Sequence, residues 1–77
     1  MKAITDYERL KSVVRARLRS MSETGEKSYA LQAKELGISK THLYSIAIDA
    51  KRSVDAETLF KIARNLDIAY RITFSYP

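Results

Sequence analysis

Two short amphipathic segments, separated by only three residues, constrain the fold of this chain more than any other feature. The first segment begins after Ser28 and stops at Gly37, and the second begins after Ser39. A serine hydroxyl can accept hydrogen bonds from the free amides at the start of a helix, and glycine readily takes the left-handed conformation that ends one. Residues 28–47 are therefore predicted to form two helices joined by a tight turn, a helix-turn-helix.

A longer helix is predicted to precede this pair. Apolar residues recur at three- and four-residue steps between Tyr7 and Met21, as on the buried stripe of an amphipathic helix. Thr5 and Glu8 have the spacing of a capping box at its start, and the polar, glycine-containing stretch 22–27 is predicted to be a loop. One flank carries basic side chains that form either a solvated edge or a phosphate-facing one: Lys11, Arg15 and Arg19.

A fourth helix is predicted after a charged loop at 48–53. Asp55 caps this helix, and Val54 and Leu59 have the positions of a hydrophobic staple across its first turn. Phe60 lies off the buried stripe, so we expect it to be covered either by the chain ends or by a second subunit.

The C-terminal tail changes from helical spacing to alternation, which predicts one β-strand over about residues 69–76. No other part of the chain has the pattern of a strand, and a lone strand leaves its backbone groups unpaired. We therefore expect the tails of two subunits to pair as an antiparallel ribbon across a two-fold axis; the alternative is a frayed tail. The residues predicted at the dimer interface are Phe60, Tyr70, Ile72, Phe74 and Tyr76.

Length and composition limit the classes of protein that this chain can be. Its 77 residues are enough for one domain, 1–77, and 14 Lys and Arg against 9 Asp and Glu give a formal charge of +5, which favours polyanions such as DNA. The absence of Cys and a single His argue against a metal site, and two glycines are too few for a phosphate-cradling loop. We therefore expect no enzyme activity, no cofactor, no metal ion and no small-molecule substrate. Because no apolar run approaches the roughly 20 residues that span a bilayer, we also expect no membrane partner and a soluble, cytoplasmic protein.

The second helix of the predicted pair has an outer face that can touch DNA bases. Opposite its apolar face it displays Lys40, Thr41, Tyr44 and Ser45, which form the predicted base-reading set. A helix in the major groove needs outward donors, acceptors and a methyl group, while its other face is fixed by packing. Lysine can reach guanine N7 and O6 or a phosphate, the hydroxyls can bond either kind of base edge, and tyrosine can bond a phosphate or pack on a thymine methyl. The plainer interpretation is a solvated polar face.

Residues 33–46 combine a small residue where two helices cross, a glycine four positions later and the pair Ile-Ser directly after it. This segment resembles the Cro and phage-repressor helix-turn-helix family, also called the xenobiotic-response-element type. The resemblance extends through Lys51–Arg52 and the segment 55–66, so that it covers about residues 28–68. It implies a mainly α fold, a four-helix helix-turn-helix domain of lambda-repressor-like type, with the C-terminal β-strand pairing across a dimer.

The resemblance also implies the DNA contacts of this chain. The four outward residues named above take the family's base-reading positions. The family's backbone-clamping positions fall on Tyr29, Lys51 and Arg52, and the neighbouring Ser39 and His42 are predicted as further contacts to the DNA backbone. Three positions depart from the family's pattern: Tyr29 replaces a frequent glutamine, Gln32 occupies a usually apolar position, and Asp49 adds a negative charge to a loop that approaches the DNA backbone.

Two functions fit this resemblance. The first is a transcriptional regulator, a Cro-like repressor that binds a palindromic site in double-stranded DNA as a homodimer. The alternative is the antitoxin of a toxin–antitoxin pair, which binds both its own operator and a toxin protein. Phe60 and the tail strand could contact a toxin as easily as a second subunit. A protein partner that co-purifies with the chain would favour the antitoxin, and a pure homodimer the repressor.

Overall fold

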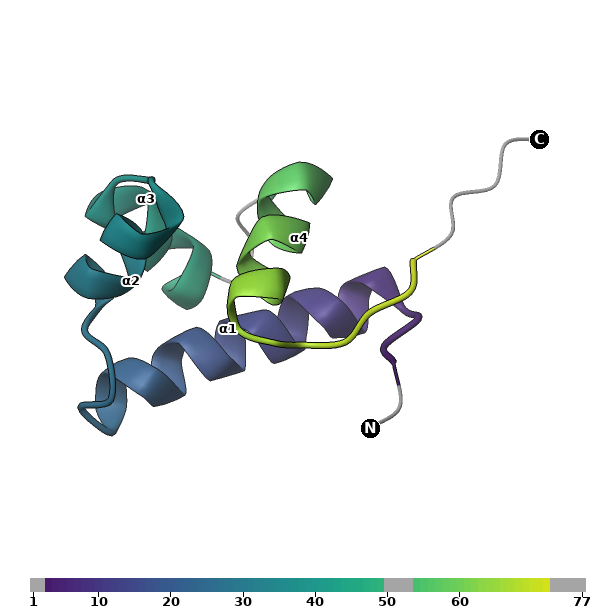
Figure 1. Cartoon of the computed structure of the whole chain (residues 1–77), viewed down its shortest axis with the longest axis horizontal. Helices are drawn as coiled ribbons and strands as arrows, with labels where there is room; N and C mark the ends of the chain where they lie inside the picture. Colours follow the sequence, from purple (N-terminus) through teal and green to yellow (C-terminus); the bar gives the residue numbers. More distant parts are fainter. Residues whose placement is uncertain (1–2, 50–53, 73–77) are drawn as a thin grey trace.

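The structure is a computed structural model, and it describes residues 3–49 and 54–72. In these residues the chain is mainly α, as expected, and forms a small helical domain. A long first helix lies along one side of the molecule, and three shorter helices pack across it (Figure 1). The helices are α1 (Tyr7–Glu23), α2 (Tyr29–Leu36), α3 (Lys40–Ile48) and α4 (Ala56–Asn65). None of the helices that the structure describes is long and apolar enough to cross a membrane.

Three of the predicted helix starts are confirmed by their capping side chains. The hydroxyl of Ser28 accepts a hydrogen bond from the amide of Leu31 at 3.2 Å, and α2 begins at the next residue. Ser39 and Asp55 do the same for α3 and α4, each accepting from an amide three residues later at 3.1 Å. Each cap satisfies an amide that has no partner within its own helix. These caps fix where the two helices of the predicted pair begin.

The predicted cap of α1 is wrong by one residue. Asp6, not Thr5, is the N-cap, and its carboxylate accepts from the amides of Glu8 at 2.9 Å and Arg9 at 3.3 Å. Both residue types cap helices well, and a carboxylate also interacts favourably with the positive end of the helix dipole. The helix therefore starts at Tyr7 without a capping box.

Two helix boundaries also differ from the prediction. The first helix continues through Glu23, so that only the end of the stretch 22–27 is a loop. The third helix continues through Ile48, which the sequence analysis assigned to the loop that follows. Of the predicted DNA-backbone contacts, Lys51 and Arg52 lie outside the described residues.

Gly37 ends α2 in the left-handed conformation, with φ at 72°. Its amide donates to the carbonyl of Lys34 at 3.2 Å, and the amide of Ile38 donates to the carbonyl of Ala33 at 3.1 Å. This pair of bonds is a Schellman motif, which satisfies two of the last carbonyls of the helix. Because glycine has no Cβ, it takes this conformation without strain, and α3 can start two residues later.

The end of α4 has the same motif without a glycine. Asp67 donates from its amide to the carbonyl of Arg64 at 3.2 Å, and Ile68 donates to Ala63 at 2.9 Å. Asp67 takes the left-handed conformation with φ at 58°, the one positive φ outside glycine among the described residues. A residue with a Cβ is strained there, although aspartate tolerates it better than most. The motif turns the chain back toward the start of α1.

The hydrophobic core lies where all four helices meet. The stripe predicted for α1 is confirmed, because Leu10, Val14 and Leu18 are fully buried. Burying a leucine side chain contributes about 1.5–3 kcal/mol relative to leaving it exposed. The residues of the other helices that complete this core are Ala33, Leu36, Leu43, Ile46, Ala47, Leu59, Ile62 and Ala63. Val54, at the staple position before α4, is buried with them.

Gln32 of α2 is the buried polar residue of the described core. Its side-chain amide donates to the carbonyl of Lys27 at 2.9 Å and to that of Leu18 at 3.4 Å. The Leu18 carbonyl belongs to α1 and the Lys27 carbonyl to the segment that connects α1 to α2, so the glutamine links this connection to the first helix. These bonds satisfy the side-chain nitrogen, whereas the buried Oε1 of Gln32 has no hydrogen-bond partner among the described residues, so the side chain is satisfied only in part.

The chain ends meet beside the start of α1 and α4. Tyr70 forms a parallel bridge with Ile4: the Ile4 amide donates to the Ala69 carbonyl at 3.0 Å, and the Arg71 amide donates to the Ile4 carbonyl at 2.7 Å. We expected no segment of the same chain to pair with the tail, and this is wrong for the first residues of the tail, which pair with Ile4. A longer C-terminal strand is not present in the residues described, and Phe74 and Tyr76 lie outside them.

Candidate nucleic-acid interface

The four residues predicted to read bases lie together on the outer face of α3. Lys40, Thr41 and Tyr44 are exposed, and Ser45 is partly buried at the edge of the face. Tyr44 keeps 50% of its surface exposed, which is high for an aromatic side chain. The opposite face of the helix is fixed in the core by Leu43, Ile46 and Ala47. The helix thus presents polar and aromatic groups to the outside from a rigid support.

Arg15 of α1 binds the C-terminal end of α3. Its Nε donates to the carbonyl of Ile46 at 3.2 Å, in the last turn of α3. The carbonyls of a last helical turn lack partners within the helix, and the negative end of the helix dipole favours a cation there. With Ser39 capping the other end, side chains hold α3 at both termini. Arg15 therefore supports α3 as well as forming an edge of α1.

Tyr29 and Tyr44 touch one another across the α2–α3 pair. Their ring centroids lie 5.4 Å apart with an angle of 88° between the ring planes, an edge-to-face contact. Tyr29 was predicted to contact the DNA backbone and Tyr44 to contact bases. Edge-to-face pairs are a favoured arrangement of aromatic rings. The partly buried Tyr29 therefore supports the exposed Tyr44 on the outer face of α3.

His42 lies on the flank of α3 near the start of α4. The pKa of the Asp55 carboxyl is lowered, first because the Thr58 hydroxyl and amide donate hydrogen bonds to it, with a smaller contribution from the charge of His42. The two residues are thus close enough to interact electrostatically. Within the described residues, no group of three or more His, Cys, Asp or Glu side chains could hold a metal ion.

Lysine side chains gather around the turn between α2 and α3. Lys34 lies in the last turn of α2 and Lys40 in the first turn of α3, and both are exposed. The ammonium of Lys61, from α4, lies 4.0 Å from where a Cβ on Gly37 would be. No local sequence pattern indicates that Lys61 belongs to this group, because it lies 24 residues beyond the turn.

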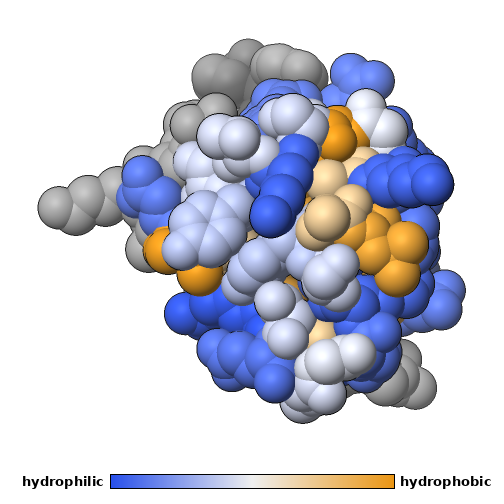
Figure 2. All heavy atoms as spheres, turned by 90° about the vertical axis from the view of Figure 1, so that its left-hand side faces the viewer, coloured by the Kyte–Doolittle hydropathy of each residue, from blue (hydrophilic) through white to orange (hydrophobic). Residues whose placement is uncertain are grey.

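The end of the molecule formed by α2 and α3 has a mixed surface (Figure 2). Pale and orange side chains occupy much of its middle, and blue, strongly hydrophilic ones lie mostly around them. Among the described residues the large apolar side chains that are most exposed are Leu31 on α2 and Tyr44 and Ile48 on α3. This end thus combines exposed apolar groups with surrounding charges.

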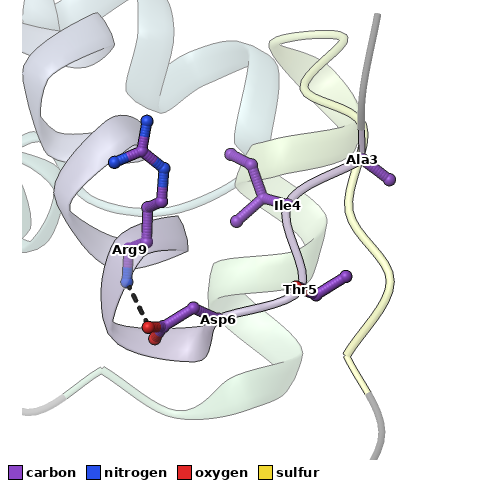
Figure 3. A pocket seen from close by; sticks show the side chains of 5 residues that line it. All are labelled: Ala3, Ile4, Thr5, Asp6 and Arg9. Atoms are coloured by element: carbon purple, nitrogen blue, oxygen red, sulfur yellow. Dashed lines mark hydrogen bonds between the residues drawn. The ribbon is translucent and has the colours of Figure 1, made fainter.

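A hollow of about 390 Å³ lies beside the segment that precedes α1, at the end of the molecule where the chain ends meet. It is lined by Ala3, Ile4, Thr5, Asp6 and Arg9. The Asp6 carboxylate is occupied by capping the helix, and the Arg9 guanidinium extends away from it (Figure 3). The hollow therefore lacks a converging set of polar groups of the kind that small-molecule sites use.

Comparison with known proteins gives no relative of this chain. No family model matches it, and neither a curated protein nor a solved structure matches it. The function proposed below therefore depends on the residues of the chain itself.

Proposed function

We propose that this protein binds a specific sequence of double-stranded DNA as a homodimer and regulates transcription there, as a helix-turn-helix protein of the Cro and phage-repressor class. The observation that carries the proposal is the outer face of α3, where Lys40, Thr41, Tyr44 and Ser45 gather opposite a buried face. We assign α3 as the reading helix of a lambda-repressor-like domain. Such a protein acts on DNA in the cytoplasm of a bacterial or phage-infected cell.

The size and rigidity of α3 support this role. A helix of 9 residues is short enough to lie in one major groove, where its first turns contact base edges. The Ser39 cap, the Arg15 bond and the core contacts fix its orientation, which a reader of base edges requires. Tyr44 is further supported by Tyr29. The outer face of α3 therefore has a fixed orientation in the free protein.

The distribution of charge supports binding to a polyanion. The chain carries a formal charge of +5, and Lys34, Lys40 and Lys61 lie around the turn that precedes the reading helix. Lysines that neutralise phosphates release counterions, so affinity should fall steeply as salt rises. We propose that Tyr29, Ser39 and His42 contact phosphates beside them. The resulting interface has lysines around a central reading helix.

The tail supports the proposed dimer. Because Ile4 bonds to the groups of Ala69 and Arg71, the amide and carbonyl of Tyr70 point to the other edge of the tail, as successive groups of a strand do. We propose that this edge pairs with the antiparallel tail of a second subunit. Two reading helices related by a two-fold axis would then enter successive major grooves about 34 Å apart.

Selection from a pool of random duplexes at about 150 mM salt tests the proposal, because affinity alone does not separate sequence recognition from charge. We expect a motif with two-fold symmetry. Lys40→Ala and Tyr44→Ala should relax preference at particular base pairs by about 1–3 kcal/mol each. Arg9→Ala removes one charge at the opposite end of the molecule and should leave the preference unchanged. No motif, with binding lost in modest salt, would refute sequence recognition; a second protein that co-purifies tightly would favour the antitoxin.

A further inference from the structure

The reading face of α3 lacks the side chains that decode most bases by hydrogen bonding. Arginine pairs bidentately with guanine, asparagine and glutamine with adenine, and the acidic residues accept from cytosine. None of these residue types occurs between Lys40 and Ile48. Apart from His42, Lys40 is the one basic side chain of the helix, and it lies at the first position. Past the first turn, the outer face therefore offers only hydroxyl and apolar groups for discriminating bases.

The end of this face is apolar. The helix continues through Ile48, and the Ile48 side chain keeps 47% of its surface exposed, close to the 50% of Tyr44. Thr41, Tyr44 and Ile48 follow one another at steps of three and four residues, so they lie along one side of the helix. The domain itself therefore leaves about half of this β-branched aliphatic side chain uncovered. The exposed part of Ile48 can make an apolar contact with a molecule that binds against α3.

We infer that this face recognises the 5-methyl groups of thymine, and that Ile48 is a specificity-determining residue beside Tyr44. The inference rests on the proposed function, since it requires α3 to lie in the major groove. The thymine methyl is the apolar group that base pairs present there, and side chains with methyl or aromatic groups contact it. The distance along the axis from Thr41 to Ile48 is about 10 Å, which matches about three base steps. Each half-site should therefore carry thymines under Tyr44 and Ile48.

The charge pattern favours DNA over a protein as the occupant of this face. Lys34, Lys40 and Lys61 lie around the turn at one end of α3, where phosphates flank a helix that enters the groove. The helix itself carries no acidic residue that would repel the phosphates, and its C-cap, Asp49, lies at the end opposite the lysines. A positively charged end followed by an apolar stripe complements a groove whose edge is phosphate and whose floor carries methyl groups.

The test replaces single thymines of the selected operator by deoxyuridine, which lacks only the 5-methyl group. The dissociation constant is measured for the wild type, for Ile48→Ala and for Leu31→Ala, a control that truncates an equally exposed residue on α2. We expect the wild type to lose about fourfold affinity at one or more thymines in each half-site, the value of one buried methyl group. At one of these positions, Ile48→Ala should bind the thymine operator and the deoxyuridine operator with the same dissociation constant. Leu31→Ala should keep the wild-type difference.

The outcomes separate this inference from the function on which it rests. If a symmetric motif is selected but every deoxyuridine operator binds as tightly as its thymine parent, the reading of methyl groups is wrong and DNA recognition stands. The same holds if Ile48→Ala retains every methyl dependence of the wild type. If no motif is selected, both proposals fail. Circular dichroism of Ile48→Ala checks that the variant is folded, and the wild-type measurement does not depend on it.

Discussion

The rings of Phe60 and Tyr70 stack face to face, with their centroids 4.8 Å apart and 7° between their planes. Tyr7 meets Phe60 from the side, at 6.3 Å and 83°, and its hydroxyl donates to the carbonyl of Val54 at 3.2 Å. The three rings come from α4, from the tail and from the start of α1. Of the two covers expected for Phe60, the structure thus supplies the one made by the chain ends.

The stack predicts a coupling between Phe60 and Tyr70 within one subunit. Phe60→Leu, Tyr70→Leu and the double variant form a cycle, and the free energy of unfolding is measured by urea denaturation. We expect a coupling of about 0.5–1.5 kcal/mol, as is typical of aromatic pairs. The coupling should not depend on protein concentration. A value that appears only at concentrations where the protein dimerises would mean that the two rings meet across subunits instead.

The two Schellman motifs predict opposite effects of exchanging their left-handed residues. Asp67→Gly should stabilise the domain by about 0.5–1 kcal/mol, because glycine removes the strain of a Cβ at φ 58°. Gly37→Asp should destabilise it by about the same amount. A Cβ at Gly37 meets no atom closer than 4.0 Å, so the cost there is conformational and not a clash. Thermal unfolding of both variants checks the signs, and a loss of stability in Asp67→Gly contradicts the prediction.

The lowered pKa of Asp55 predicts a dependence of stability on pH. Its hydrogen bonds from Thr58, and to a lesser degree the charge of His42, lower the pKa in the folded state below the ordinary value of 3.8. A lowered pKa stabilises the folded state above the ordinary value, and this contribution is lost as the pH falls through the folded pKa. In Asp55→Asn the side chain still accepts from the Thr58 amide but does not titrate.

As the pH falls from about 5 to about 2, the unfolding free energy of the wild type is therefore expected to decrease relative to that of Asp55→Asn. Urea denaturation at several pH values across this range measures it. All other carboxyl groups titrate in both proteins and cancel in the difference. Parallel pH profiles would show that Asp55 is not preferentially ionised in the folded state.

Local signals predicted much of this fold. Ser28, Ser39 and Asp55 each act within three residues, and Gly37 is the residue type that a left-handed helix end favours, so these positions could be identified from short stretches of sequence. The buried stripe of α1 follows from spacing alone. The predicted start of α1 is off by one residue because Thr5 and Asp6 are neighbours that can both cap a helix, and the spacing of Thr5 and Glu8 favoured the weaker of the two.

Contacts between distant segments could not be predicted in this way. Ile4 pairs with Tyr70 without any alternating pattern around it, so nothing in its neighbourhood indicated a strand. Lys61 reaches the turn at Gly37, and Arg15 reaches the end of α3, because packing of the helices brings them there. The base-reading set could be placed on one face from helical spacing, whereas the support that Tyr29 gives to Tyr44 depends on how α2 crosses α3.

That support predicts how Tyr29 contributes to DNA binding. Tyr29→Phe keeps the edge-to-face ring contact, and Tyr29→Ala removes it. We expect Tyr29→Ala to weaken binding to the selected operator by about two- to tenfold, the range that aromatic pairs contribute, and to have little further effect when Tyr44 is already alanine. Fluorescence anisotropy with operator and random duplexes measures both variants. A loss of affinity in Tyr29→Phe on both duplexes would assign the hydroxyl to a phosphate, whereas additive effects of Tyr29→Ala and Tyr44→Ala would show that the two rings act independently.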